Sequence, residues 1–254
     1  MNLLAIIGGT GLGSLKNLEI TRHQVVNTPF GEPSGPLSFG TLGGCEVVFF
    51  ARHGYSHRIP PHEINYRANM WALKEVGVIQ IISVAAVGGI TPRMGPAVLA
   101  VPDQIIDYTH GRAHTYFEGE LESVTHIDFT HPYSEVVRRA LMSSAREAGV
   151  AIEDGGTYGC TQGPRLETIA EIRRMERDGC DLVGMTGMPE AALARELGLE
   201  YAHLAVIANW AAGKNGDEEI SMGEIDRTLR EGMRKVRSIL QHLLAHRTDS
   251  TPIA

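Results

Sequence analysis

A glycine-rich segment near the start of this chain is of a type that can bind an oxyanion. Gly8-Gly9-Thr10-Gly11 follows a short apolar run, and its small residues leave backbone N–H groups accessible beside a hydroxyl. The segment fits neither the G-x-G-x-x-G pattern of dinucleotide sites nor the Gly-Lys-Ser/Thr ending of a Walker A loop. On its own, it indicates a tight turn and an oxyanion site equally.

Two further polar groups follow apolar runs that are expected to be buried strands. Arg52 and His53 come after one such run, and Thr186 comes after another. A buried arginine needs an anionic partner, and its planar fork matches two oxygens of a phosphate. In open α/β sheets, ligands bind outside the carboxyl ends of the strands. We therefore expect these groups to meet Thr10 in one anion site.

Histidine spacing raises the alternative of a metal site. Histidines lie four residues apart at His53 and His57 and again at His110 and His114. A cluster follows at His126, Asp128 and His131. No H-E-x-x-H or Cys-x-x-Cys element accompanies them, and residues 109–119 have the composition of a loop. We therefore expect ordinary loop histidines and no metal.

Cys160 and Glu167 each allow a chemical and a structural interpretation. Cys160 could act as a nucleophile, but a single cysteine at the end of an apparent strand is more often a small packed residue. Glu167 follows the turn Gly163-Pro164-Arg165 and is expected in the first turn of a helix. There its carboxylate would either complement the helix dipole or accept a hydrogen bond from a heterocycle.

Short apolar runs alternate with helical patterns, and these elements must position the residues above. Strands are predicted over residues 3–7, 46–51, 79–86, 181–185 and 201–208, with an extended segment over 97–106 that is broken at Pro102. Helices are predicted over residues 65–76, 134–148, 166–178 and 221–245. No linker or low-complexity run divides the chain, so we expect an α/β fold that forms a single domain over residues 1–254.

The overall composition argues against several classes of function. Hydrophobic residues make up 43% and charged residues 21%, as in a globular protein with a full core. The net charge of −7 argues against a nucleic-acid binder, which needs a basic surface. Three scattered cysteines suit a reducing compartment, and the first apolar run is too short for a signal or membrane helix. We expect a cytoplasmic protein with no membrane or nucleic-acid partner.

Six motifs occur along the chain in a fixed order. They are Ile6-Ile7-Gly8-Gly9-Thr10-Gly11-Leu12, Thr28-Pro29-Phe30-Gly31, Ala51-Arg52-His53-Gly54, Asn65-Tyr66-Arg67-Ala68-Asn69, Gly163-Pro164-Arg165 and Gly184-Met185-Thr186. From residue 5 to about residue 225, the chain resembles the methylthioadenosine phosphorylase branch of the trimeric purine nucleoside phosphorylases. The resemblance implies a mixed central sheet flanked by helices, phosphorolysis of a purine nucleoside, a homotrimer, and no metal or organic cofactor.

The resemblance also implies roles for single residues. In the family's reaction, phosphate attacks C1′ of the nucleoside as the bond to the base breaks, and positioning and preorganised electrostatics do most of the work. Met185 would lie against the ribose, Asn209 would be the hydrogen-bond partner of N7, and His126 would reach into a neighbouring subunit's site. Phosphate would be held by Thr10, Arg52, His53, Thr186 and the backbone around Ala85 and Ala86.

The base end departs from the adenosine-type members, which carry an Asp-x-Asp arrangement. This chain has Asn209-Trp210-Ala211 instead. The carboxamide of Asn209 can donate to a 6-oxo group while its oxygen accepts from a protonated N7, and losing such a match costs ~1–3 kcal/mol. Glu167 resembles the 6-oxopurine branch, whose glutamate bonds the base. Leu166 stands where many relatives have an aromatic residue on the sugar, and Ala85 replaces a threonine of the phosphate segment.

The segment near the 5′ end of the nucleoside is apolar. Ile220, Met222 and Ile225 occupy the region where inosine-specific members have a histidine for the 5′-hydroxyl. Core packing competes as an interpretation of the isoleucines, so Met222 is the expected pocket wall, with Ile225 and Ala211 as further contacts. An apolar wall favours a methylthio group over a hydroxyl by ~1–3 kcal/mol.

Base and sugar signals together predict phosphorolysis of S-methyl-5′-thioinosine. The alternatives are a phosphorylase of inosine and guanosine, a methylthioadenosine phosphorylase, or a non-catalytic protein that binds phosphate or a nucleotide. The replacement at Ala85 is the best support for the last of these, because it removes a hydroxyl from the phosphate segment.

Overall fold

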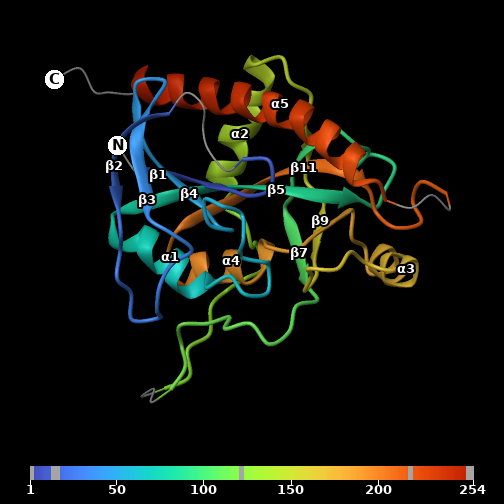
Figure 1. The fold of residues 1–254 in the computed structure, drawn as a ribbon, viewed down its shortest axis with the longest axis horizontal. Helices are drawn as coiled ribbons and strands as arrows, with labels where there is room; N and C mark the ends of the chain where they lie inside the picture. Colours follow the sequence, from blue (N-terminus) through green and yellow to red (C-terminus); the bar gives the residue numbers. More distant parts are fainter. Residues whose placement is uncertain (1–2, 13–17, 120–122, 217–219, 250–254) are drawn as a thin grey trace.

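The computed structural model describes residues 3–12, 18–119, 123–216 and 220–249, and its strands form one mixed sheet (Figure 1). The hydrogen-bonded path through the sheet runs β2-β3-β4-β1-β5-β10-β9-β7, while β11 pairs with β5 and β6, and β8 pairs with β6. The strands are β1 (Leu3–Gly8), β2 (Glu19–Gln24), β3 (Leu37–Leu42), β4 (Cys45–Ala51), β5 (Val78–Gly89), β6 (Leu99–Val101), β7 (Gln104–Asp107), β8 (Glu153–Asp154), β9 (Thr157–Cys160), β10 (Leu182–Gly184) and β11 (Glu200–Trp210). The predicted fold class is confirmed.

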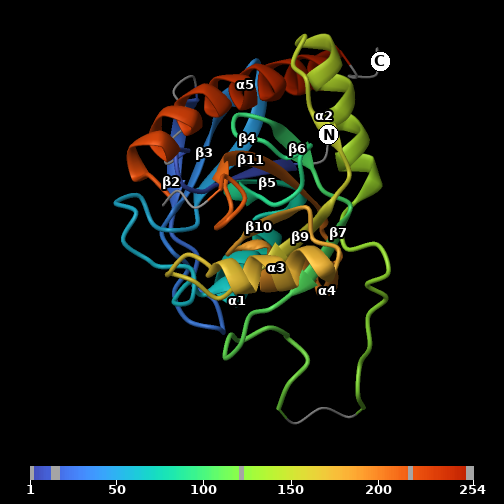
Figure 2. The same ribbon diagram turned by 90° about the vertical axis from the view of Figure 1, so that its right-hand side faces the viewer.

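Helices cover both faces of this sheet. They are α1 (Tyr66–Glu75), α2 (Glu135–Glu147), α3 (Ile169–Arg177), α4 (Gly187–Glu196) and α5 (Met222–Asp249). α2 and α5 pack on one face, and α1 and α4 pack on the other (Figures 1 and 2). None of the helices within the described ranges is long and apolar enough to cross a membrane.

The first strand shows how side-chain alternation builds the two cores. Leu4 and Ile6 belong to the cluster formed with α2 and α5, whereas Ala5 and Ile7 belong to the cluster formed with α1 and α4. Successive side chains of a strand point to opposite faces, so a strand that is apolar at every position is buried on both. Each fully buried leucine or isoleucine contributes about 1.5–3 kcal/mol.

Capping residues define the starts of three helices. Asn65 caps α1 and Ser134 caps α2, as their predicted ranges imply, and each side-chain oxygen accepts from a backbone N–H of the first turn. α3 begins later than predicted, because Thr168 caps it and forms a capping box with Glu171. Glu167 precedes this cap, so its predicted place in the first turn of the helix is wrong.

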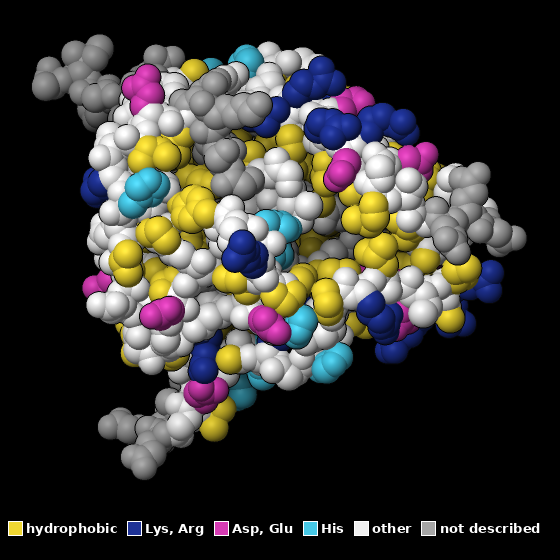
Figure 3. Space-filling model, in the orientation of Figure 1, with side chains coloured by type: hydrophobic (Ala, Val, Ile, Leu, Met, Phe, Trp, Pro, Cys, Tyr) yellow, Lys and Arg dark blue, Asp and Glu magenta, His cyan; other side chains and the backbone are white. Residues whose placement is uncertain are grey.

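Pro102 divides the predicted extended segment into two strands with different partners. β6 pairs with β11 and β8, whereas β7 pairs with β9. The connection from β7 to α2 extends away from the sheet in both ribbon views (Figures 1 and 2). On the face drawn in Figure 3, cationic and anionic side chains are interspersed, so this face has no surface of a single sign.

Candidate active site

A cavity of about 180 Å³ lies at the carboxyl ends of several strands. Residues at or after the ends of β1, β4, β5, β10 and β11 meet there. Among the residues predicted from the sequence, it is lined by Thr10, Arg52, His53, Ala85, Ala86, Leu166, Glu167, Met185, Thr186, Asn209, Ala211 and Ile225. The structure therefore brings the predicted phosphate and base residues into one place.

The course of β5 explains why a cavity opens here. β1 pairs with β5 as far as Ile7 and Ser83, and β10 pairs with β5 at Val183 and Gly88. β11 pairs with β5 along almost its whole length, so β1 and β10 share the opposite edge. Among the described strands, none pairs with that edge over residues 84–87. Such a change of neighbour is the switch point at which open α/β sheets bind ligands.

The glycine-rich segment forms a turn that closely approaches the arginine. The N–H of Leu12 donates to the carbonyl of Gly9 at 3.0 Å. A Cβ on Gly9 would come within 2.6 Å of Arg52 Nη1 and 2.9 Å of the Val84 carbonyl oxygen. The segment is thus the tight turn that one interpretation expected, and glycine is required at residue 9 because the backbone lies against a guanidinium.

Arg52 is fully buried, and its guanidinium is held by the protein itself. Nε and Nη2 donate to the two carboxylate oxygens of Glu190 at 3.0 and 3.2 Å. Nη2 also donates to Ser83 Oγ at 2.5 Å, and Nη1 donates to the Val84 carbonyl at 2.9 Å. The planar fork therefore binds Glu190, and it is not open to the two phosphate oxygens that the sequence suggested. These contacts use four of the five N–H groups and leave one on Nη1, the nitrogen beside Gly9.

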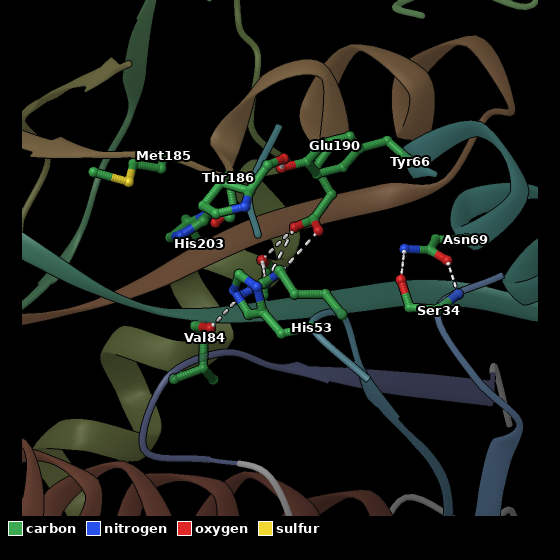
Figure 4. A network of polar contacts seen from close by, with 12 residues as sticks. Ser34, His53, Tyr66, Asn69, Val84, Met185, Thr186, Glu190 and His203 are labelled. Carbon is green, nitrogen blue, oxygen red and sulfur yellow. Dashed lines mark hydrogen bonds and ion pairs between the residues drawn. The ribbon is translucent and has the colours of Figure 1, made fainter. Parts of the chain in front are cut away.

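Glu190 and Arg52 form an ion pair in which both side chains are about 1% exposed. Burial alone would raise the pKa of Glu190, but the charge of Arg52 and the hydrogen bonds that the carboxylate accepts outweigh burial and lower that pKa. The carboxylate points from α4 toward the strands, in the direction of Val84 and His53 (Figure 4). The pair is therefore ionised although it is fully buried.

Tyr201 and His203 extend this buried network. The hydroxyl of Tyr201 donates to Glu190 at 2.7 Å and lies 3.0 Å from His203 Nδ1. Burial lowers the pKa of His203 to about 3, so the ring is neutral at pH 7. Since the Tyr201 proton is directed to Glu190, Nδ1 of His203 must carry the proton that it donates to Tyr201.

His53 is also a neutral histidine. Its Nδ1 lies 2.8 Å from the Ile59 carbonyl oxygen, so Nδ1 carries the proton and Nε2 is an acceptor. Burial and the neighbouring charge of Arg52 lower the pKa of His53 to about 4. The ring of His57 lies 4.6 Å from that of His53, and its Nε2 is 3.5 Å from Thr10 Oγ1.

Met185 and Thr186 follow β10 into the cavity. Thr186 precedes α4, but its side chain makes no capping hydrogen bond to that helix, so the buried hydroxyl is not committed to the helix end. Met185 packs on the segment before α3, because a Cβ on Gly163 would come within 2.4 Å of Met185 Sδ. The position of the thioether is thus set by the turn that precedes Glu167.

A β-bulge near the end of β11 places Asn209. Ile207 lies opposite Val87 and Asn209 lies opposite Gly88, so the register between β11 and β5 shifts by one residue. Bulges of this kind re-aim side chains next to binding sites. Asn209 Nδ2 donates to the Trp210 carbonyl at 2.7 Å, which leaves its second N–H and Oδ1 for other partners.

Glu167 lies between two cavities. It lines the cavity described above and also a larger one of about 630 Å³, which contains Thr161 and Arg165. Thr161 Oγ1 donates to Glu167 Oε1 at 2.6 Å, so Oε2 is the oxygen left for another group. Because Glu167 precedes the helix cap, this geometry favours the heterocycle-binding interpretation over the helix-dipole one.

Cys160 is packed rather than poised as a nucleophile. Burial raises the pKa of its thiol to about 12, and its sulfur accepts from the Met188 N–H at 3.2 Å. A nucleophilic cysteine needs its thiolate, which such a thiol does not form near neutral pH. Within the described ranges, no group of three or more His, Cys, Asp or Glu side chains could hold a metal ion.

Comparison with known proteins identifies the family. Residues 3–245 match the family described as "Phosphorylase superfamily". A relative from Pseudomonas syringae pv. tomato, named "Probable S-methyl-5'-thioinosine phosphorylase", is 57% identical over 96% of this chain and 99% of its own length. The chain belongs to the phosphorylase superfamily.

Other members of the superfamily agree with this assignment. The 6-oxopurine nucleoside phosphorylase of Pyrococcus furiosus is 48% identical over 85% of this chain and 82% of its own length. The structure of methylthioadenosine phosphorylase from Schistosoma mansoni in complex with adenine has a TM-score of 0.93 and 31% identity, covering 99% of this chain and 93% of that one. The family resemblance seen in the sequence motifs is confirmed.

Two residues predicted for the site of this phosphorylase superfamily member lie elsewhere. Met222 is the first residue of α5 and is 66% exposed, so it does not form the cavity wall, and that prediction is wrong. Ile220 and Ile225 line the cavity instead. Ile220 precedes α5, and Ile225 lies about one turn after Met222 and packs against the core. His126 is exposed on the connection between β7 and α2, and its reach into a neighbouring subunit stays a prediction.

Sequence reasoning misses three residues beside the site: Glu190, Thr161 and His57. Glu190 lies in α4, whose apolar residues surround the helix and show no amphipathic period. The one signal for it is a carboxylate within an apolar run, which requires a cationic partner when buried. Thr161 and His57 are ordinary polar residues in sequence, and only the folded chain shows their contacts.

Proposed function

We propose that this chain catalyses the phosphorolysis of S-methyl-5′-thioinosine to hypoxanthine and 5-methylthioribose 1-phosphate. The observation that carries the proposal is a single cavity lined both by Asn209 and Glu167 and by Thr10, His53 and Thr186. The amide and carboxylate suit a 6-oxopurine, and the hydroxyls and imidazole suit an oxyanion. The name of the P. syringae relative supports the same reaction.

Phosphate is proposed to bind among Thr10, His53, Thr186 and the open edge of β5. The two hydroxyls donate to phosphate oxygens, and the remaining N–H of Arg52 Nη1 adds a charge-assisted hydrogen bond. Neutral His53 offers Nε2 as an acceptor, and phosphate near pH 7 still carries an O–H that can donate to it. Backbone N–H groups of β5 serve where Ala85 replaces a hydroxyl residue.

In the proposed reaction the sugar loses an electron pair to the base and gains one from phosphate. The N9–C1′ bond breaks with its electron pair left on the purine, and a phosphate oxygen forms the new bond to C1′. The purine takes a proton at N7 from water, and phosphate gives up one proton to water as it becomes the sugar phosphate, so the reaction balances. Phosphate stabilises the cationic sugar, and Asn209 Oδ1 accepts from N7–H. No metal or organic cofactor takes part in this scheme, so a chelator is expected to leave the rate unchanged.

Glu167 and Asn209 account for the proposed choice of a 6-oxopurine. Oε2 of Glu167 accepts from N1–H, which hypoxanthine has and adenine lacks. The second N–H of Asn209 donates to O6. An adenine base would set the acceptor N1 against a carboxylate, and each polar group left unpaired costs about 1–3 kcal/mol.

Ile220 and Ile225 account for the methylthio group. Both line the cavity near the start of α5, and neither side chain can bind a 5′-hydroxyl. A pocket contact of this kind separates a methylthio group from a hydroxyl by about 1–3 kcal/mol. The two isoleucines therefore take the role that the sequence suggested for Met222.

Kinetics with three nucleosides test the proposal. We expect kcat/KM for S-methyl-5′-thioinosine to exceed the values for inosine and for methylthioadenosine by about tenfold or more. This factor is the effect of losing one pocket contact or one hydrogen bond to the base. Hypoxanthine release must depend on phosphate. A preference for methylthioadenosine would contradict the roles of Asn209 and Glu167, and a preference for inosine would contradict the isoleucine wall. Without phosphate-dependent release, a non-catalytic binding protein becomes the better description.

We also propose a cytoplasmic homotrimer in which His126 completes a neighbouring site. The connection that carries His126 extends away from the rest of the chain, which leaves its exposed side chain accessible to a second copy (Figure 2). Light scattering should give three times the chain mass of 27.6 kDa. His126→Ala should raise KM for the nucleoside without changing this mass, and a monomeric active enzyme would contradict the proposal.

A further inference from the structure

Glu190 receives hydrogen bonds from residues of two strands and from the residue that follows a third strand. Oε1 accepts from Arg52 Nε at 3.0 Å, while Oε2 accepts from Ser83 Oγ at 2.6 Å and Tyr201 OH at 2.7 Å, and from Arg52 Nη2 at 3.2 Å. Arg52 follows β4, Ser83 lies in β5 and Tyr201 lies in β11. Because the donors approach from different elements, the carboxylate has one position, and the guanidinium that it binds has one orientation.

Stability alone does not explain this ion pair. Replacing a buried pair by well-packed apolar side chains is often neutral or stabilising, because desolvation of two charges offsets their attraction. This pair lies against the cavity, since Arg52 lines it and Nη1 is the nitrogen nearest to Gly9. Its geometry therefore bears on whatever anion the cavity holds.

We propose that Glu190 is a positioning residue that occupies the fork of Arg52 and so restricts the arginine to a single N–H contact with phosphate. This inference rests on the proposed function and names a residue that governs how its second substrate is held. The carboxylate also offsets the charge of Arg52, so phosphate meets a neutral pair rather than an isolated buried cation.

The restriction favours reaction over tight binding. A free fork would bind phosphate through two charge-assisted hydrogen bonds, which stabilise the anion in its ground state. In the reaction, phosphate gives electron density to C1′, and interactions that bind the ground state as well as the transition state do not raise kcat. Holding the fork on Glu190 leaves phosphate oriented, yet reactive and able to leave as the sugar phosphate.

Glu190→Gln tests the inference, with inorganic phosphate as the calorimetric probe. The amide keeps the size of the side chain but removes its charge and one acceptor, which releases the fork. We expect Kd for phosphate to fall about tenfold and kcat to fall about 30-fold or more, while KM for the nucleoside stays within about threefold. A folded variant with unchanged or weaker phosphate binding, or with kcat within about threefold of wild type, would overturn the proposal.

Two further variants keep the test informative if Glu190→Gln does not fold. Ser83→Ala removes the hydroxyl that links Arg52 Nη2 to Glu190, and Tyr201→Phe removes one donor to the carboxylate. Both should shift phosphate binding and kcat in the same directions by smaller factors. Unchanged phosphate Kd and kcat in both variants would contradict a positioning role.

Glu196→Gln is the matched control. Glu196 lies in the same helix, but it binds Thr115 Oγ1 and the Tyr116 N–H on the connection after β7 rather than Arg52. It should leave phosphate Kd and kcat at wild-type values. If Glu196→Gln reproduces the effects of Glu190→Gln, the positioning role is refuted, because any loss of charge in α4 would then suffice.

Wild-type turnover separates the failure of this inference from the failure of the proposed function. Phosphate binding by calorimetry needs no nucleoside. If wild type releases no base but Glu190→Gln binds phosphate more tightly, the reaction is wrong and the role of Glu190 toward phosphate is supported. If wild type is active and Glu190→Gln behaves like wild type, the function stands and the inference fails.

Discussion

At the scale of single residues, the cavity contains polar groups whose hydrogen bonds are already partly made. Asn209 has one N–H on the Trp210 carbonyl, Glu167 has one oxygen on Thr161, and Arg52 has four of its five N–H groups on protein partners. Each side chain therefore has only a few donors or acceptors left for a ligand, and their directions are fixed. Such preorganised groups need little rearrangement when charge develops on a ligand.

Asn209→Asp should shift base preference toward adenine. The carboxylate can accept from a 6-amino group but cannot donate to a 6-oxo group, so an unpaired acceptor replaces a hydrogen bond. We expect the ratio of kcat/KM for methylthioinosine over methylthioadenosine to fall about tenfold or more. Steady-state assays with both nucleosides measure this ratio. An unchanged ratio would mean that other residues determine the choice of base.

Thr161→Val should lower kcat/KM for 6-oxopurine nucleosides without changing phosphate binding. Valine has the shape of threonine but cannot donate to Glu167 Oε1, so the carboxylate loses the contact that orients it. We expect kcat/KM for methylthioinosine to fall about tenfold, the effect of about 1.4 kcal/mol, while phosphate Kd stays constant. Thr21→Val is a suitable control, because Thr21 lies in β2 and donates to the Phe39 carbonyl. Loss of phosphate affinity in Thr161→Val would point to a general disturbance of the cavity.

At the scale of elements, the site depends on irregularities in an otherwise regular sheet. The edge of β5 is open between its pairings with β1 and β10, and β11 bulges before Asn209. The turn after β1 closes over the guanidinium at Gly9. Regular pairing builds the frame, and the points where pairing changes create room for a ligand.

Gly9→Ala should damage phosphate use more than overall stability. The added Cβ would lie 2.6 Å from Arg52 Nη1 and 2.9 Å from the Val84 carbonyl oxygen, so the guanidinium or the turn must move. We expect kcat/KM for phosphate to fall by about two orders of magnitude, with a loss of about 1–3 kcal/mol in unfolding free energy. Gly223→Ala in α5 is the control, because its nearest contact would be Ser221 Oγ at 3.8 Å and alanine favours a helix. Wild-type phosphate kinetics in Gly9→Ala would contradict the close approach.

The elements that could be predicted from the sequence are those with local signals. α1 and α2 have clear caps and apolar stripes, and β1 is a continuous apolar run. β2 could not be predicted, because every residue in it is exposed and only pairing with β3 makes it a strand. α4 could not be predicted either, because it is buried on most sides.

The same limit applies to the site. The cluster at the strand ends follows from residue types and from the rule that strand ends meet, so Thr10, Arg52 and Thr186 could be placed together. The partner of Arg52 could not be found in this way, because Glu190 is 138 residues away in the chain and lies in the helix without a pattern. Contacts that depend on packing between distant elements have no local signal.

At the scale of the whole molecule, the site and the core share one buried network. His53 lines the cavity, whereas His203 lies in the interior and contacts the Tyr201 hydroxyl. That hydroxyl donates to Glu190, whose carboxylate also binds Arg52. Both histidines are buried and neutral in the folded state, with pKa values lowered to about 4 and about 3. Protonating either one would add a charge beside Arg52. Folding therefore opposes protonation at two places in the same network.

This opposition predicts a loss of stability in mild acid. Well above pH 6.5, both histidines are neutral whether the chain is folded or unfolded, so they add no pH dependence. From pH 6.5 down to about 4, the unfolded chain binds protons at these positions and the folded chain does not, so the unfolding free energy falls as pH falls. Each histidine contributes about 1.4 kcal/mol per pH unit, or about 2 kcal/mol between pH 6.5 and 5. Denaturant unfolding at several pH values measures this slope.

His203→Gln identifies which groups cause the slope. Glutamine keeps an N–H that can donate to Tyr201 but does not titrate, so the variant should show about half the wild-type slope between pH 6.5 and 5. Carboxylates whose pKa values are lowered, such as Glu171 at about 2, lose their contribution to stability only below pH 4.5, because in that range the unfolded chain binds the proton and the folded chain does not. An undiminished slope in His203→Gln would contradict the assignment, since it would place the acid sensitivity outside the network that joins Arg52 to the core.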